Sequence, residues 1–313
     1  MTGEIMILNY TVKKQDENMS IKDIMSKRLY LSKILIYEII GEKMYYLNDK
    51  TTFTNTKVKE NDILKVILPK EKTAFKNKFK LVDTPLDILF EDDYLLIINK
   101  PANMPVHPSA NNYDNTLSNI VAAYLEKQDI HSIHILTRLD KNTTGICIFA
   151  KNKYIQELFV RKKEEINLKK IYICAVRGII KKSGIINKNI TRKENTIILR
   201  KVSNDPTVGD FAKTEYFPLK INEDKNYTLL KVLLHTGRTH QIRVHMSYIL
   251  HPLLGDELYS KEYDFSLSNE EIFRYIKRPA LHCYNITFNH PITHKKIDIK
   301  SKIPEDIDML FNM

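Results

Sequence analysis

The segment 137–145, Thr-Arg-Leu-Asp-Lys-Asn-Thr-Thr-Gly, is the densest polar cluster of the sequence and directly precedes an apolar run, 146–150. Loops held by the strands of a rigid sheet often carry catalytic groups. Asp140 stands between Arg138 and Lys141, and cations beside a carboxylate favour its ionised form. Such a carboxylate can act as a nucleophile or a general base. An aspartate ahead of a turn can also simply bond to its own backbone.

A second polar cluster, 234–245, reads Leu-His-Thr-Gly-Arg-Thr-His-Gln-Ile-Arg-Val-His. Its histidines, His235, His240 and His245, are five residues apart, whereas ligands on one helical face are about four apart. This spacing disfavours a metal site. Arg243 falls in the first turns of an expected helix, where its guanidinium can pair with a carboxylate or a phosphate. A surface phosphate contact or a solvated charge is the simpler alternative.

A third cluster, 169–178, reads Lys-Lys-Ile-Tyr-Ile-Cys-Ala-Val-Arg-Gly and has the alternation of a strand. The alternation places Tyr172, Cys174 and Val176 on one face. An aromatic ring beside lysines is suited to stacking on a nucleic acid base. A core tyrosine with a bonded hydroxyl fits the same pattern.

Apolar periodicity and capping residues predict the elements that hold these groups. Helices are expected over 21–25, 31–40, 117–125, 154–159 and 239–250, and after a capping-box pair, Ser268 and Glu271. Strands are expected over 44–47, 63–68, 88–90, 95–98, 146–150, 171–176, 196–202, 214–219, 228–234, 286–288 and 296–299. Hairpins with scattered helices favour an α+β fold with a mostly antiparallel sheet.

The composition is that of a soluble globular chain, with 43% hydrophobic and 28% charged residues among 313. No apolar run approaches the roughly 20 residues of a membrane helix, so no membrane partner is expected. The cysteines, Cys147, Cys174 and Cys283, lie in apolar strings. They are expected to be reduced core thiols of a cytoplasmic protein.

The charge is unevenly distributed along the chain. The formal net charge is +11, and residues 151–201 contain 15 basic and 4 acidic side chains, which is the same net +11. A local excess of this size indicates a polyanionic partner, either a nucleic acid or a membrane surface. A solvated lysine-rich face is the alternative.

The three clusters, together with four further motifs, resemble in order and spacing the RluA/RluD-type pseudouridine synthases. The further motifs are Lys-Pro-Ala-Asn-Met-Pro-Val-His-Pro at 100–108, Leu-Gly-Asp-Glu-Leu-Tyr at 254–259, Arg-Pro-Ala-Leu-His at 278–282 and Phe-Asn-His-Pro at 288–291. The chain departs from the family pattern at Thr137, where histidine is usual, and at Thr144, where serine is usual. Neither change removes the acid of the first cluster.

The resemblance implies a curved, mixed, mostly antiparallel sheet flanked by helices, and conversion of uridine to pseudouridine in RNA without metal or organic cofactor. It assigns Asp140 as the essential carboxylate, Tyr172 as the platform beneath the uracil and Arg243 as the ion-pair partner of Asp140, holding both of its oxygens. RNA-binding roles are implied for Arg138, Lys141, Lys169, Lys170, Arg238 and His240. The carboxylate could attack the anomeric carbon, add to carbon six of uracil or remove the 2′ proton, and the sequence leaves these open.

Residues 10–70 resemble, more loosely, the small S-four-like RNA-binding domain that precedes many of these enzymes. The resemblance rests on Leu-Ser-Lys at 31–33, Gly41 and Tyr-Leu-Asn at 46–48. The expected organisation is a small α/β RNA-binding module at 1–70, a linker at 71–84 that lets it move independently, and a catalytic domain at 85–313.

An RNA pseudouridine synthase is therefore expected. Its implied partner is structured RNA, large-subunit ribosomal RNA before transfer RNA, because the front module is typical of that branch. The chain is expected to be a monomer. The alternative is an RNA-binding or ribosome-assembly protein on the same fold without catalysis. Asp140, Tyr172 and Arg243 together favour the enzyme, since binding of a polyanion alone does not require a carboxylate.

Overall fold

The computed structural model describes residues 6–71, 80–108, 113–194, 196, 198–260 and 275–312. The strands are β1 Ile7–Thr11, β2 Tyr45–Leu47, β3 Ile63–Ile67, β4 Ile88–Glu91, β5 Leu95–Lys100, β6 His134–Ile135, β7 Thr144–Ala150, β8 Lys169–Arg177, β9 Gly184–Asn187, β10 Ile190–Arg192, β11 Arg200–Val202, β12 Lys213–Asn222, β13 Tyr227–Leu234, β14 Leu281–Asn289 and β15 Lys296–Lys300. The helices are a 3₁₀ turn at Lys14–Asp16, α1 Ile21–Lys27, α2 Lys33–Gly41, α4 Leu117–Glu126, α5 Lys153–Arg161, α6 Lys163–Ile166, α7 Gln241–Tyr248, α8 Glu257–Ser260 and α10 Glu305–Asn312.

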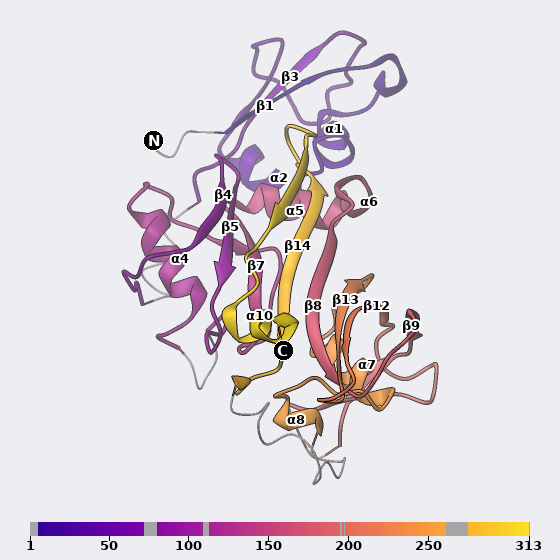
Figure 1. Cartoon of the computed structure of the whole chain (residues 1–313). Coiled ribbons are helices and arrows are strands. Elements are labelled where there is room, and N and C mark those ends of the chain that lie inside the picture. The colour runs from indigo at the N-terminus through magenta and orange to yellow at the C-terminus, as the bar shows by residue number, and fades with distance from the viewer. Residues whose placement is uncertain are drawn as a thin grey trace.

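A ten-stranded sheet forms the body of the molecule (Figure 1). Its order is β4-β5-β7-β14-β8-β13-β12-β9, with β15 paired to β14 and β6 to β7. Strands β7 and β14 are parallel, whereas the other described pairs of this sheet are antiparallel. This confirms the predicted α+β class with a mixed, mostly antiparallel sheet.

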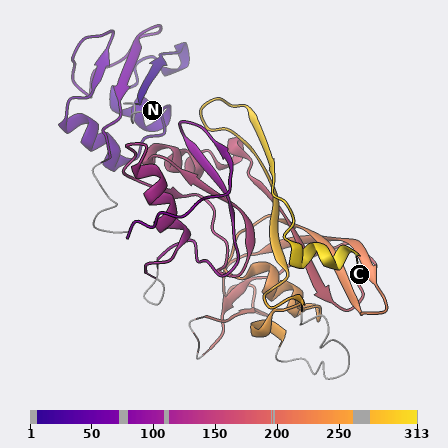
Figure 2. The ribbon, with the colours of Figure 1, turned by 60° about the vertical axis from the view of Figure 1, so that its left-hand side comes forward.

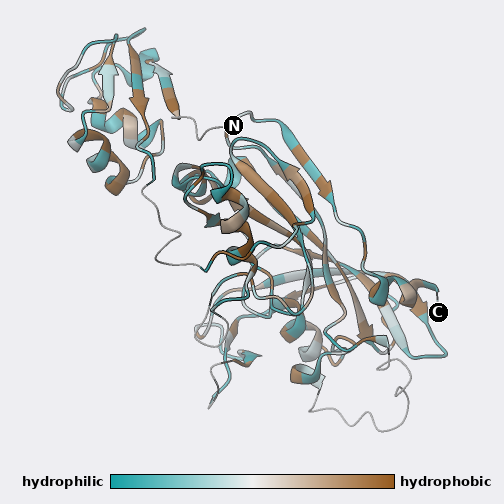
Figure 3. Ribbon diagram, turned by 90° about the vertical axis from the view of Figure 1, so that its left-hand side faces the viewer, coloured by the Kyte–Doolittle hydropathy of each residue, from teal (hydrophilic) through white to brown (hydrophobic). Residues whose placement is uncertain are grey.

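Helices cover both faces of this sheet. Along β7, Ile146 and Ile148 share a core with α5, whereas Cys147 and Phe149 face the opposite way, toward α4. Further along, α10 packs on the face of β8 that carries Ile173. Because both faces are buried, β7 and the middle of β8 consist mainly of apolar residues. Figure 3 shows hydrophobic stretches, in brown, along strands of the sheet.

The N-terminal residues form a separate three-stranded sheet in the order β1-β3-β2, with α1 and α2 beside it. Ser20 and Ser32 accept hydrogen bonds from the third residue of α1 and α2, respectively, and so begin these helices as capping residues. In Figures 1 and 2 this module lies at one end of the long sheet, and β12 and β13 extend toward the other. The predicted helices and the strands β2 and β3 are present. Strand β1 was not predicted.

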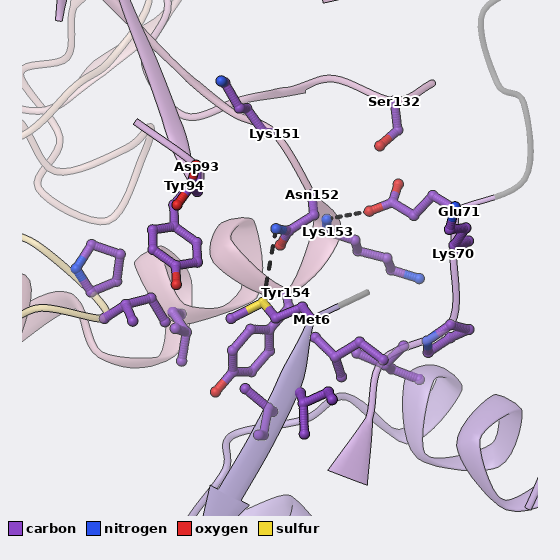
Figure 4. A pocket seen from close by; sticks show the side chains of 18 of the residues that line it. Met6, Lys70, Glu71, Asp93, Tyr94, Ser132, Lys151, Asn152, Lys153 and Tyr154 are labelled. Carbon is purple, nitrogen blue, oxygen red and sulfur yellow. Dashed lines mark hydrogen bonds between the residues drawn. The ribbon is translucent and has the colours of Figure 1, made fainter. Parts of the chain in front are cut away.

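Several contacts join the N-terminal module to the large sheet. Glu71 accepts hydrogen bonds from the backbone N–H of Lys153, at the start of α5, and from His134 (2.8 Å). The backbone N–H of Ser32 donates to Glu157 of α5 (2.8 Å). Figure 4 shows Glu71 and its partner beside a cavity of about 1120 Å³ at this junction. Among the described residues of the predicted linker, Val82 donates to the backbone of α4.

Three sequence predictions differ from the structure. The strand expected over 196–202 is confined to β11, because the Thr196 hydroxyl accepts from the N–H groups of Ile198 and Leu199 and so forms a turn there. The helix expected over 239–250 is shorter, since His240 takes a left-handed backbone conformation (φ 57°) just before α7. The capping box of Ser268 lies outside the described residues.

The three cysteines are buried and unpaired, as predicted. Among the described residues, no helix has the length and apolar character needed to cross a membrane.

Candidate active site

A cavity of about 240 Å³ collects residues from all three sequence clusters. Most of its lining comes from three segments: the loop before β7, the beginning of β8, and the segment from the end of β13 into α7. Among the lining residues are seven that the sequence predicted as site residues: Arg138, Asp140, Lys170, Tyr172, Arg238, His240 and Arg243. The cavity at the module junction is larger, but the carboxylate, phenol and guanidinium that could perform chemistry meet in the smaller one.

Asp140 lies at the rim of this cavity, in a turn closed by the backbone hydrogen bond from Thr143 N–H to its own carbonyl (3.1 Å). The turn therefore does not need the side chain of Asp140 to cap it. Gly145, at the start of β7, has φ +107°, and a Cβ there would lie 2.3 Å from the carbonyl oxygen of Cys283. This glycine lets β7 approach β14 and fixes where the turn leaves the sheet.

Lys100 supports the turn from beneath. Its side chain is 1% exposed, and its Nζ donates to the carbonyls of Pro101 (2.8 Å), Met104 (2.8 Å) and Lys141 (3.0 Å). Burial lowers the pKa of Lys100 to about 8. The sequence predicted no role for this lysine, although Lys100 and Pro101 open the family motif at 100–108, which was a signal that the lysine serves the site.

The predicted bidentate pairing of Arg243 with Asp140 is wrong. Its bidentate partner is Asp256, with Nε–Oδ2 at 2.7 Å and Nη2–Oδ1 at 2.8 Å, whereas a single N–H, on Nη1, reaches Asp140 Oδ2 at 3.4 Å. Burial alone would lower the pKa of Arg243, but the bonds to Asp256 raise it. Asp256 is 1% exposed and directly precedes α8, and it binds the Nε and Nη2 edge of the guanidinium. The Arg243–Asp140 contact is real but not bidentate.

Tyr172 lies on the cavity side of β8 and is 4% exposed. It shares this face with Lys170, which also lines the cavity, as the strand alternation predicted. Burial raises the pKa of Tyr172 well above its ordinary value, so the phenol stays protonated at neutral pH. Burial likewise lowers the pKa of Lys170. Lys169 points to the other face of β8 and is separated from the cavity.

His240 is the second side chain that faces Asp140, with Nε2 3.9 Å from Oδ2. Its Nδ1 is 2.8 Å from the hydroxyl of Tyr259. The same hydroxyl accepts the backbone N–H of Arg200 (3.0 Å). Burial lowers the pKa of His240, which favours the neutral imidazole at pH 7. Tyr259 and Asp256 both belong to the motif at 254–259, for whose residues the sequence predicted no role.

The remaining predicted RNA contacts lie at the surface. Arg138 and Lys141 are exposed on the turn that carries Asp140. Arg238 is exposed at the other side of the opening, where its Nε donates to the carbonyl of Phe211 (3.0 Å). Lys151, at the start of the basic stretch 151–201, is instead buried against Glu91 (2.8 Å). Part of that stretch therefore serves the fold.

The three histidines of the second cluster have separate surroundings. His235 bonds to Glu215 (3.0 Å), and the fully buried His245 bonds to the Thr214 hydroxyl (2.9 Å). Within the described residues, no three histidine, cysteine or acidic side chains converge as a metal site would require.

Comparisons with known proteins agree with this arrangement. Residues 94–248 match the family model of RNA pseudouridylate synthases. The chain is 34% identical over 263 residues to a ribosomal large subunit pseudouridine synthase D of Vibrio vulnificus, covering 82% of this chain and 78% of that protein. It is 32% identical over 285 residues to an uncharacterized RNA pseudouridine synthase of Bacillus subtilis, covering 90% of this chain and 95% of that one.

The fold has a solved counterpart. The human RNA pseudouridylate synthase domain containing 4 protein superposes with a TM-score of 0.57 at 22% identity, covering 72% of this chain and 91% of that chain. The family model and the curated relatives define the class, the RNA pseudouridine synthases. Within that class, the chain belongs to the RluA/RluD-type family and is an RNA pseudouridine synthase, an isomerase.

Proposed function

We propose that the protein isomerises uridine in large-subunit ribosomal RNA, with Asp140 as the catalytic carboxylate. The observation that carries the proposal is the meeting of Asp140, Tyr172 and Arg243 around one cavity, from three distant parts of the chain. The choice of RNA is supported by relatives named for the ribosomal large subunit.

The reaction breaks the bond between the sugar and N1 of uracil, turns the base and rejoins it through C5. Asp140 is 26% exposed at the cavity rim, which supports the proposal that its carboxylate acts on the sugar or on the base. Three first steps are chemically compatible with such a carboxylate: attack on the anomeric carbon, addition to C6, and removal of the 2′ proton. The protonated phenol of Tyr172 forms the cavity wall on which uracil would rest.

Asp140 and Tyr172 line a cavity, and a uracil that is still stacked in the RNA cannot enter it. The uridine must therefore be flipped out of its stack to reach the carboxylate. Flipping a base costs a few kcal/mol, which contacts to the flanking backbone must offset. Arg138, Lys141 and Arg238, exposed around the opening, would supply such phosphate contacts. Binding would then weaken steeply with added salt.

The N-terminal module is proposed to be a separate RNA-binding domain at residues 1–70, and the chain to act as a monomer in the cytoplasm. Residues 1–80 have 16 basic and 10 acidic side chains, whereas the seven family motifs all lie beyond them. A truncated chain that starts at Leu81 should stay folded, with a cooperative melting transition, and should bind RNA more weakly. An insoluble truncated chain would contradict the division.

The substrate is tested by mapping pseudouridine in ribosomal and transfer RNA from cells with and without the protein. The proposal expects at least one large-subunit position that loses its pseudouridine without the protein and regains it when purified protein is added. Loss confined to transfer RNA would contradict the assignment to ribosomal RNA.

A further inference from the structure

We propose that Asp256 is a positioning residue of the synthase: it fixes Arg243 so that one N–H alone reaches Asp140. This inference rests on the proposed catalytic role of Asp140. Asp256 belongs to the motif at 254–259, to which the resemblance assigned no task.

The guanidinium of Arg243 is a rigid group. Its five N–H groups lie in one plane, so fixing Nε and Nη2 also fixes the direction of Nη1. Asp256 holds those two nitrogens at 2.7 and 2.8 Å, and the ring of Tyr259 lies over the guanidinium, 5.0 Å from its carbon. Nη1 is left directed at Asp140.

The contacts that Asp140 receives are confined to one of its two carboxylate oxygens. The contacts from Arg243 (3.4 Å) and His240 (3.9 Å) both go to Oδ2. Among the residues that the structure describes, no side chain bonds Oδ1. One carboxylate oxygen is thus oriented, and the other stays available to the uridine.

The charge of Asp256 keeps the guanidinium of Arg243 from pairing more closely with Asp140. Arg243 faces two carboxylates, and the shorter bonds go to the one that is 1% exposed. Without the charge of Asp256, the guanidinium could turn and take both oxygens of Asp140 in the bidentate geometry that such pairs prefer. A reactive carboxylate would then become a structural one.

The backbone around Asp256 is built to keep it in place. The N–H of Leu254 donates to the carbonyl of Ala175 on β8 (2.9 Å), the strand that carries Tyr172. Gly255 has φ +70°, and a Cβ there would lie 2.1 Å from the carbonyl oxygen of Arg278. The position of Asp256 is therefore tied to the same strand as the cavity wall.

A matched control is available in the same chain. Arg278 and Asp306 form a pair of equal geometry, with Nε–Oδ2 at 2.7 Å and Nη2–Oδ1 at 2.8 Å. Asp306 lies on α10 and does not line the cavity. Asp256→Asn and Asp306→Asn thus remove the same charge from the same kind of pair. Nη1 of Arg243 reaches the carboxylate of Asp140, whereas Nη1 of Arg278 reaches backbone carbonyls, among them that of Asn142 in the turn after Asp140 (3.2 Å).

The experiment measures the single-turnover rate of pseudouridine formation at saturating RNA, RNA affinity and thermal melting for both variants. The RNA is an unmodified transcript that the parent protein modifies, so a wrong substrate assignment shows in the parent and not in the ratio of variant to parent. We expect Asp256→Asn to lose about 10- to 100-fold in rate, with affinity within about threefold. Asp306→Asn should lower the melting temperature and leave the single-turnover rate of pseudouridine formation unchanged.

A double variant separates positioning from packing. If Asp256 acts through Arg243, adding Asp256→Asn to Arg243→Lys should cost much less than it costs in the parent. Additive losses, or a rate of Asp256→Asn within twofold of the parent, would overturn the proposal. Should Asp256→Asn fail to fold, Asp256→Ser, which is smaller and leaves room for water, is measured by the same criteria.

Discussion

Two arginines of this protein each grip an aspartate through Nε and Nη2 at the same distances, 2.7 and 2.8 Å, yet they serve different regions. At Arg278, Nη1 donates to the backbone carbonyls of Asn142, Pro279 and Leu281 (3.2 Å each), so the pair fastens α10 to the sheet and to the turn that follows Asp140. At Arg243, Nη1 points to the carboxylate of Asp140. The two pairs therefore differ in what the third nitrogen contacts: backbone carbonyls at Arg278, and the proposed catalytic carboxylate at Arg243.

The largest effect in this comparison is expected for Arg243→Lys. A lysine ammonium keeps the charge but cannot hold Asp256 with two parallel bonds and still direct an N–H at Asp140. The single-turnover rate should fall about 100-fold or more. Unchanged turnover of a folded Arg243→Lys protein would show that the guanidinium fork is not needed.

A smaller effect is expected for the structural pair. Asp306→Asn should destabilise the protein by about 1–2 kcal/mol, less than a fully buried pair because the Asp306 side chain is 31% exposed. Chemical denaturation measures this difference, and pseudouridine formation at saturating RNA should stay within about twofold of the parent. A collapse of the rate with unchanged stability would erase the contrast between the two regions.

A further prediction concerns pH and His245, a buried histidine within α7. Burial lowers the pKa of His245 to about 4. Between pH 6.5 and 4 the unfolded chain therefore binds a proton that the folded chain does not, and stability falls as pH falls through this window. The loss from this one group is at most about 3 kcal/mol. Replacing His245 by Gln should flatten the pH dependence of unfolding between these values; an unchanged slope would assign the acid sensitivity to other groups.

Much of the site was predictable from sequence because its parts are local. The polar run before β7 placed Asp140 at a strand end, and strand alternation placed Tyr172 on a defined face of β8. What brings them together, the order β7-β14-β8, involves β14, a late strand of which only the stretch 286–288 was recognised.

The choice of partner for Arg243 was not predictable in the same way. Asp140 and Asp256 are both aspartates in family motifs, and a sequence does not rank two acceptors for one guanidinium. The ranking follows from the left-handed Gly255 and from the attachment of Leu254 to β8, which are long-range features. The burial of Lys100 is of the same kind, because its three acceptors form only after the turn has folded.

Asp140→Asn tests the central claim most directly. The amide is nearly isosteric with the acid but is neither a nucleophile nor a base. The hydrogen bond that closes the turn, from the Thr143 N–H to the Asp140 carbonyl, uses no side-chain atom of Asp140. Melting, RNA affinity and pseudouridine formation are measured on one preparation. We expect a folded protein whose RNA affinity is equal or slightly higher, since one negative charge facing a polyanion is gone, and whose pseudouridine formation is undetectable. Substantial pseudouridine formation by the folded Asp140→Asn protein would contradict the assignment of Asp140 as the catalytic carboxylate.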